Sequence, residues 1–349
     1  MIIRTIGFII VLSLLADVQV FSQEDRRDKS AVTFEELYDE PYATNKLFVG
    51  FQPLYGEVFA TNVNAGFGVE ASYYHQDKFD LKFNFRKPYS STFYDLNRFT
   101  AQKNTDVGNK GIGFGYVELG GTYHIKDFDQ PSKTKMVLYK RSYKGDLWAA
   151  RVPLQAEVPC KVRKIYGARL GGIFWNSTAD INRVLERQKL TNKDLVMVND
   201  ETSSLPLTHV GVNGQVENLD VFSNIRSVGL YAGGSISWIR NIAVSFDKYE
   251  EGVDDGMMTL FFDILYSPSV KVDNIQYQGD TYSTSAIKIS PVGARLGIDG
   301  KFNRTLSWAY GGEIGYRPSF QGGGFFALFK ISFPMYGTNL DYKVESFGK

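Results

Sequence analysis

The feature that most constrains this chain is a strict alternation of residue types near its C-terminus. Between positions 292 and 302, one set of alternate residues is apolar, namely Val292, Ala294, Leu296, Ile298 and Phe302. The other set is small or charged, namely Gly293, Arg295, Gly297, Asp299 and Lys301. Successive side chains of a β-strand point to opposite faces, so this period of two predicts a strand with one apolar face.

The same alternation recurs along the chain. A second run at 306–316 follows across a turn at 303–305, whose odd length keeps both apolar sets on one face. Other alternating runs lie at 63–73, 79–86 and 228–246. Further candidate strands are 47–55, 111–125, 135–140, 158–175, 257–266 and 324–335. The sequence thus predicts an all-β, antiparallel fold.

The composition of the two strand faces favours a transmembrane barrel over a soluble one. In a small soluble barrel the apolar side chains point inward and fill the interior. Here the face opposite the apolar residues is mostly Gly, Ser, Asn and charge, which suits a wet interior, so the large apolar side chains are expected to face lipid. Aromatic residues near strand ends are expected to form the interfacial girdle. These are Tyr73, Trp238, Tyr266, Trp308 and Tyr316.

The first 22 residues are typical of a secretory signal peptide. Arg4 precedes an apolar run from Ile6 to Leu15, and a Val20-Phe21-Ser22 ending suits cleavage before Gln23. The alternative, a short membrane anchor, needs about 20 consecutive apolar residues, and Asp17 interrupts the run. We therefore expect export and an integral position in the outer membrane of a Gram-negative cell.

Composition limits the possible partners and stabilising bonds. The 39 Lys and Arg residues nearly balance the 38 Asp and Glu residues, so no nucleic-acid partner is expected. Cys160 is the single cysteine, which excludes an intramolecular disulfide. Aromatic residues make up 15% of the chain, yet no 18-residue apolar stretch follows the signal, so strands and not helices are expected to cross the membrane.

The expected number of barrel strands is about 12 to 14. Splitting the 228–246 run gives twelve segments, an even number as bacterial barrels require. With the N-terminus in the periplasm, however, that count puts the long 176–224 stretch on the side of the short turns. The Asn213-Gly214 pair is a hairpin signal, so two more strands there would give fourteen. Alternatively, 228–246 is one long strand and a single strand lies in the 176–224 stretch.

Three segments outside the strands are candidate surfaces for other outer-membrane or periplasmic proteins. They are a charged tail at 23–45, the insertion 176–224 within a barrel spanning 46–336, and a tail at 337–349. The N-terminal tail shows no alternation and is expected to be disordered or bound to a partner. Within the insertion, 178–190 carries a weak amphipathic helix pattern, expected to cap the barrel or to dock a protein.

These features resemble the outer-membrane β-barrels of the Bacteroidota. Signal peptides of that group often end just before Gln, as Phe21-Ser22-Gln23 does here. The resemblance covers the barrel as a class and identifies no single family. Such barrels usually finish on a terminal aromatic residue, whereas here the 333–336 segment is followed by thirteen more residues that include Phe347.

No motif predicts catalysis, metal binding or a cofactor. His75, His124 and His209 have no nucleophile motif beside them, and Gly-x-Ser-x-Gly is absent. One cysteine and three scattered histidines do not form a local metal-ligand cluster. The chain is therefore expected not to be an enzyme and to hold no metal or cofactor, with outer-membrane lipid as its surroundings.

The alternation also predicts which charged side chains face the lumen. They are Glu70, Asp80, Lys82, Arg86, Arg169, Arg295, Asp299, Lys301, Glu313 and Arg317. Charges of both signs can select permeating solutes, but they can equally pair across a narrow interior and close it. The favoured hypothesis is a structural or accessory subunit of an outer-membrane assembly in secretion, protein insertion or envelope machinery. The alternatives are a porin-like channel or transporter for small solutes and, less favoured, a lipid-modifying enzyme.

Overall fold

A computed structural model describes residues 32–337, apart from 76–77, 139–153, 212, 248 and 305–307. The expected signal peptide at 1–22, most of the tail after 336 and Phe347 lie outside the described residues. The described residues from Phe34 onward belong to one compact unit.

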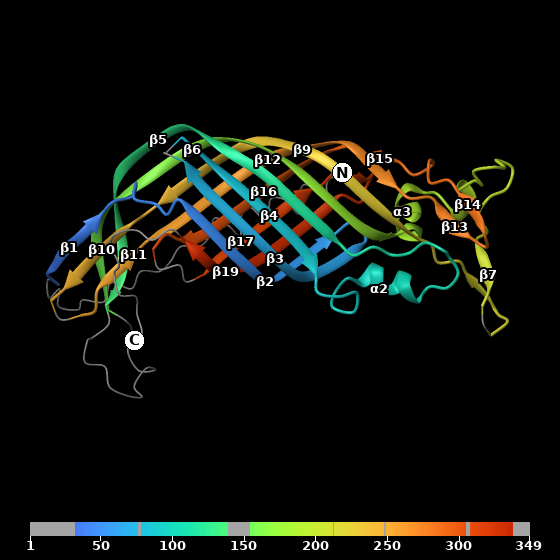
Figure 1. Cartoon of the computed structure of the whole chain (residues 1–349), viewed down its shortest axis with the longest axis horizontal. Helices are drawn as coiled ribbons and strands as arrows, with labels where there is room; N and C mark the ends of the chain where they lie inside the picture. Colours follow the sequence, from blue (N-terminus) through green and yellow to red (C-terminus); the bar gives the residue numbers. More distant parts are fainter. Residues whose placement is uncertain are drawn as a thin grey trace, which may run out of the picture. The chain divides into compact units, whose positions relative to one another are not determined.

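Ten antiparallel strands of the described chain close a barrel (Figure 1). They are β2 (Leu47–Phe59), β3 (Asn62–His75), β4 (Phe79–Pro88), β5 (Gly115–Leu138), β6 (Leu154–Asp180), β9 (Phe222–Ile239), β12 (Gly256–Val272), β16 (Val292–Phe302), β17 (Ala309–Tyr316) and β19 (Phe325–Gly337). Each barrel strand pairs with the next along the chain, and β19 pairs with β2 to close the ring. The predicted all-β antiparallel barrel is confirmed.

The count of ten corrects the expected 12 to 14 strands. The segments 111–125 and 135–140 belong to one strand, β5, of 24 residues, which pairs with the 27-residue β6 far beyond the barrel wall. The 228–246 run contributes only β9 to the barrel, because β10 (Ile242–Phe246) joins a separate sheet. The Asn-Gly hairpin exists as β7 (Thr208–Val210) and β8 (Val216–Asn218), but these two strands pair only with each other among the described strands.

Ten strands also resolve the topological conflict over the insertion. β2 begins and β19 ends at the same end of the barrel, here called the termini end, and the turns after β3 and β16 lie there as expected. The opposite end, here called the loop end, carries the connections 89–114, 181–221, 273–291 and 317–324. The 176–224 insertion therefore lies mostly at the loop end, opposite the short turns after β3 and β16.

The wall shows the predicted alternation between outward and inward residues. Leu119, Ile125 and Leu170 are each more than 60% exposed on the outer face, while inward positions of the same strands are mostly buried. Of the expected girdle, Tyr73, Trp238 and Trp308 lie at strand ends near the termini end. Tyr266 and Tyr316 lie toward the loop end.

The loops at the loop end fold together into a cap. It contains α2 (Leu96–Lys103), α3 (Ile181–Gln188), the 3-10 turn η1 (Asn192–Asp194), β7, β8, β13 (Ile275–Tyr277), β14 (Asp280–Tyr282), β15 (Ile289–Ser290) and β18 (Ser319–Phe320). The α3 helix matches the amphipathic pattern expected at 178–190: Asp180 caps its N-terminus, and Ile181, Val184 and Leu185 are buried in the apolar core of the cap. None of the helices in the described ranges is long and apolar enough to cross a membrane.

A second small region lies at the termini end. β1 (Phe34–Asp39) pairs with β10, which pairs with β11 (Gly252–Asp254). The ends of β5 and β6 that extend past the barrel form a two-stranded ribbon against this sheet, where the Thr134 hydroxyl donates to Asp254 at 2.6 Å. The tail at 23–45 was thus wrongly expected to lack structure at 34–39, because pairing with a distant strand leaves no local alternation signal.

Candidate functional site: the barrel interior

All ten charged residues predicted to face the lumen lie on the inward side of the wall. They contact one another and a few further buried groups, while the side chains of Glu70 and Asp299 stay 22% and 30% exposed. They fall into a central charge cluster and a smaller group around a cavity nearer the termini end. The described interior is therefore a polar core of paired charges with a cavity in it.

The central charge cluster is organised around Asp263 on β12. One carboxylate oxygen accepts from Arg169 Nε at 2.9 Å, and the other accepts from Arg295 Nε at 2.9 Å. Arg295 also donates to Glu118 at 3.1 Å and Glu313 at 3.2 Å. The Asp263 side chain is fully buried and those of the two arginines almost so. Because these groups come from five strands, the cluster ties opposite walls of the barrel together.

Two further arginines extend this cluster toward the loop end. Arg317 donates both terminal nitrogens to Glu57, at 3.1 and 3.2 Å, in a buried bidentate pair. The Arg86 guanidinium stacks over the Tyr116 ring, 3.9 Å from its centroid. Tyr116 in turn donates to Glu118 at 2.7 Å, which joins these aromatic contacts to the ion pairs.

Sequence reasoning missed the three carboxylates that neutralise these arginines. Glu118 and Asp263 lie in segments recognised only as candidate strands, whose two faces were not separated, and Glu57 lies just past the end of the 47–55 candidate. The alternation of residues between the two faces of a strand could have identified them. In β12, for example, Asp263 shares its face with the buried Phe261 and Leu265, opposite the exposed Phe262 and Ile264.

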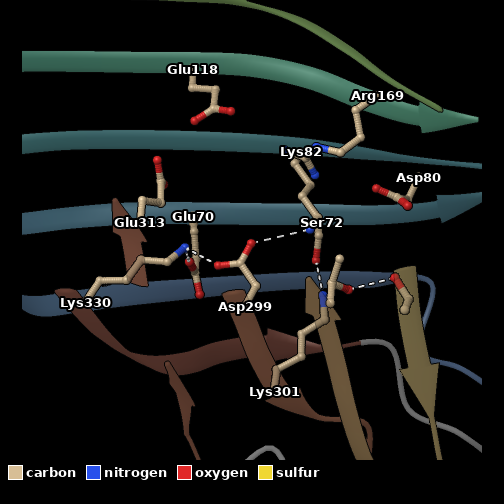
Figure 2. Close-up of polar contacts among 12 residues, drawn as sticks. Glu70, Ser72, Asp80, Lys82, Glu118, Arg169, Asp299, Lys301, Glu313 and Lys330 are labelled. Carbon is tan, nitrogen blue, oxygen red and sulfur yellow. Dashed lines mark hydrogen bonds and ion pairs between the residues drawn. The ribbon is translucent and has the colours of Figure 1, made fainter. Parts of the chain in front are cut away.

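A cavity of about 70 Å³ lies in the half of the lumen nearer the termini end. Its charged lining consists of Glu70, Lys82, Asp299, Lys301 and Lys330 (Figure 2). Lys330 Nζ lies 2.8 Å from Glu70 and 3.2 Å from Asp299. Lys82 Nζ lies 3.5 Å from the other oxygen of Asp299.

Deeper toward the termini end, the remaining predicted lumen charges have different partners. Lys301 donates to the Ser72 hydroxyl at 2.6 Å. Asp80 lies 3.3 Å from His124 Nε2.

Apolar layers lie on both sides of the charged interior. At the termini end, Phe48, Ile165, Ile239 and Met257 form a buried cluster against which Tyr74 packs. At the loop end, the interior continues into the apolar core of the cap, where Phe59 and Trp175 meet edge to face at 4.7 Å. The layer at the termini end adjoins the cavity, because Phe48, Tyr74 and Met257 also line it.

The structure does not bring the three histidines together. His75 ends β3 and stacks on Phe79, His124 faces the lumen on β5, and His209 lies in the cap 3.3 Å from Asp106. Within the residues that the structure describes, no group of three or more His, Cys, Asp and Glu side chains is arranged to hold a metal ion.

Comparison with known proteins gives little beyond this geometry. No protein-family model and no curated protein matches the chain. Among solved structures it is similar to one titled "CymD monoaromatic hydrocarbon channel", with 8% sequence identity and a TM-score of 0.24. That alignment covers 86% of this chain and 93% of the other. The barrel described above rests on its strand pairing and not on this likeness.

Proposed function

We propose that this protein is a closed outer-membrane barrel that serves as a structural or accessory subunit of an envelope assembly. The observation that carries the proposal is the filled interior, in which buried ion pairs join opposite walls. The exposed apolar outer face supports the membrane location. The folded regions at both ends, the cap and the β5–β6 ribbon with its sheet, supply surfaces for partner proteins.

The energetics of the central charge cluster disfavour an open pore. A solute path would require Arg295 and Asp263 to separate, and breaking a buried ion pair costs about 3–5 kcal/mol. Arg295 has three carboxylate partners, so its displacement would break several contacts at once. An interior crossed by several buried ion pairs fits a scaffold better than a solute channel.

We expect the purified full-length protein to show no stepwise conductance in planar bilayers at 100 mV, since buried ion pairs of Arg295 with Glu118 and Asp263 cross the lumen. Insertion is verified independently by protease protection in the same lipid. Reproducible single-channel steps would contradict the closed barrel. They would favour the second candidate function, a small-solute channel, for which the charged cavity is the supporting observation.

We expect a protein partner to co-purify with this chain from native membranes and to depend on the termini end. β1 is the edge strand of its sheet and exposes Glu35 and Glu36, so replacing both with Lys should reduce partner recovery at least tenfold. Glu201→Lys, an exposed change in the cap, is the matched control. A chain that purifies alone from native membranes in mild detergent would contradict the subunit role.

We also propose that the chain has no catalytic role in lipid modification. The separation of His75, His124 and His209 supports this, because His-dependent hydrolysis needs a histidine oriented beside a nucleophile. Alanine at each of the three positions should leave envelope lipid composition unchanged by mass spectrometry. Altered lipid A in any one variant would reopen the enzymatic alternative.

A further inference from the structure

We propose that the lumen cavity binds one small monovalent anion, of the size of chloride or bromide, between the ammonium groups of Lys82 and Lys301. This inference goes beyond the accessory role and does not depend on it. It rests on how unevenly the carboxylates around the cavity are shared among its three lysines.

Of the three lysines, Lys330 makes the most contacts with carboxylates. Its ammonium group contacts both Glu70 at 2.8 Å and Asp299 at 3.2 Å. Lys82 reaches only Asp299, at 3.5 Å, and shares that carboxylate with Lys330. Lys82 is thus incompletely neutralised.

Lys301 has no carboxylate within ion-pair distance in the described part of the chain. Its ammonium group donates to Ser72 Oγ and lies over the rings of Phe48 and Tyr74, 4.1 and 4.8 Å from their centroids. The nearby Asp80 is engaged by His124 at 3.3 Å. Among the described residues, two of the three ammonium donors of Lys301 therefore have no hydrogen-bond acceptor assigned.

Lys82 and Lys301 enter this part of the lumen from β4 and β16, and Figure 2 shows both side chains directed toward Ser72. Two ammonium groups directed to one place repel each other, and isolating a charge from water is costly unless it is paired. The cavity lining carries three lysines and two carboxylates, a formal excess of one positive charge. A single monovalent anion would restore neutrality.

The size of the cavity sets the class of anion. On this measure about 10–15 Å³ holds one water, so a cavity of about 70 Å³ has room for a halide ion together with a few waters.

The test uses bromide as the probe. The full-length protein is folded into detergent micelles in bromide buffer and crystallised, and anomalous scattering is measured at the bromine edge. We expect one peak in contact with both Lys82 and Lys301 Nζ. That peak should be lost in Lys301→Met and retained in Lys133→Met, a change at a surface lysine whose side chain is 72% exposed.

Thermal unfolding supplies a second readout if a variant does not crystallise. At constant ionic strength, replacing gluconate by chloride should raise the Tm of the wild type by about 2–4 °C for each tenfold increase above the Kd. Lys301→Met should show no such rise. A cavity that contains only water in bromide-grown crystals, or a chloride effect that is equal in Lys301→Met, would overturn the proposal.

Discussion

Asp263→Asn should lower the free energy of unfolding by about 3–5 kcal/mol, the usual cost of removing one partner from a buried ion pair. Asparagine keeps the shape and one acceptor oxygen but removes the charge that Arg169 and Arg295 share. Arg295 retains Glu118 and Glu313, whereas Asp263 is the only carboxylate that the structure places in ion-pair contact with Arg169 among the described residues. Most of the loss therefore arises from a buried Arg169 left without a counterion.

The measurement is urea-induced unfolding in detergent, monitored by tryptophan fluorescence and by the mobility of unheated samples on gels. Glu157→Gln is the matched control, because Glu157 pairs with Lys133 on the exposed ribbon. Exposed pairs contribute about 0.2–1 kcal/mol, so this change should be small. Equal losses in both variants would mean that the central charge cluster contributes no more than a surface pair.

Gly233→Ala is expected to destabilise the barrel by about 1–3 kcal/mol through overpacking. A methyl group at Gly233 would lie 2.0 Å from the Phe262 carbonyl oxygen and 2.7 Å from Asp263 Cα. These are backbone atoms of the neighbouring strand, so they cannot move aside without disturbing the β9–β12 pairing. The Asp263 carboxylate, 2.4 Å from the added methyl, would be displaced as well.

The adjacent glycine gives a control on the same strand. Gly234 faces the opposite side of the wall, where an added methyl would lie 3.7 Å from the Gly167 carbonyl oxygen, an ordinary contact. Gly234→Ala should be neutral or slightly stabilising, since it restricts the unfolded chain. Folding yield and urea midpoint in the two variants measure the difference. Similar losses of stability in Gly233→Ala and Gly234→Ala would contradict this prediction. They would show that alanine affects both positions through its strand propensity and not through a clash with Asp263.

The barrel class could be predicted from the sequence because alternation is a local property. The inward positions of Arg295 and Asp299 follow directly from the parity of one strand. The length of a strand carries no such signal. β5 continues through Pro131 into the polar ribbon. In the ribbon no residues face lipid, and proline is tolerated there because the ribbon is not part of the closed barrel. That is why one strand was interpreted as two.

The pairing of the charges could not be predicted. Arg295 and Glu118 are 177 residues apart and lie on strands that are not neighbours in the barrel. Which inward charges meet depends on the stagger and tilt of the closed ring, and no short segment encodes these. The sequence therefore left an open and a closed lumen as alternatives, and the ion pairs between Arg295, Glu118 and Asp263 support the closed lumen proposed above.

A closed barrel, as proposed above, has a consequence for the membrane that holds it. Every open pore lets detergents, antibiotics and bile-like amphiphiles cross the membrane. A higher copy number of such a pore therefore makes the envelope more permeable. With a polar core packed between two apolar layers, a higher copy number of this barrel would not raise the permeability. A cell could carry this protein at high abundance, as an anchoring site repeated across its surface, without becoming more permeable.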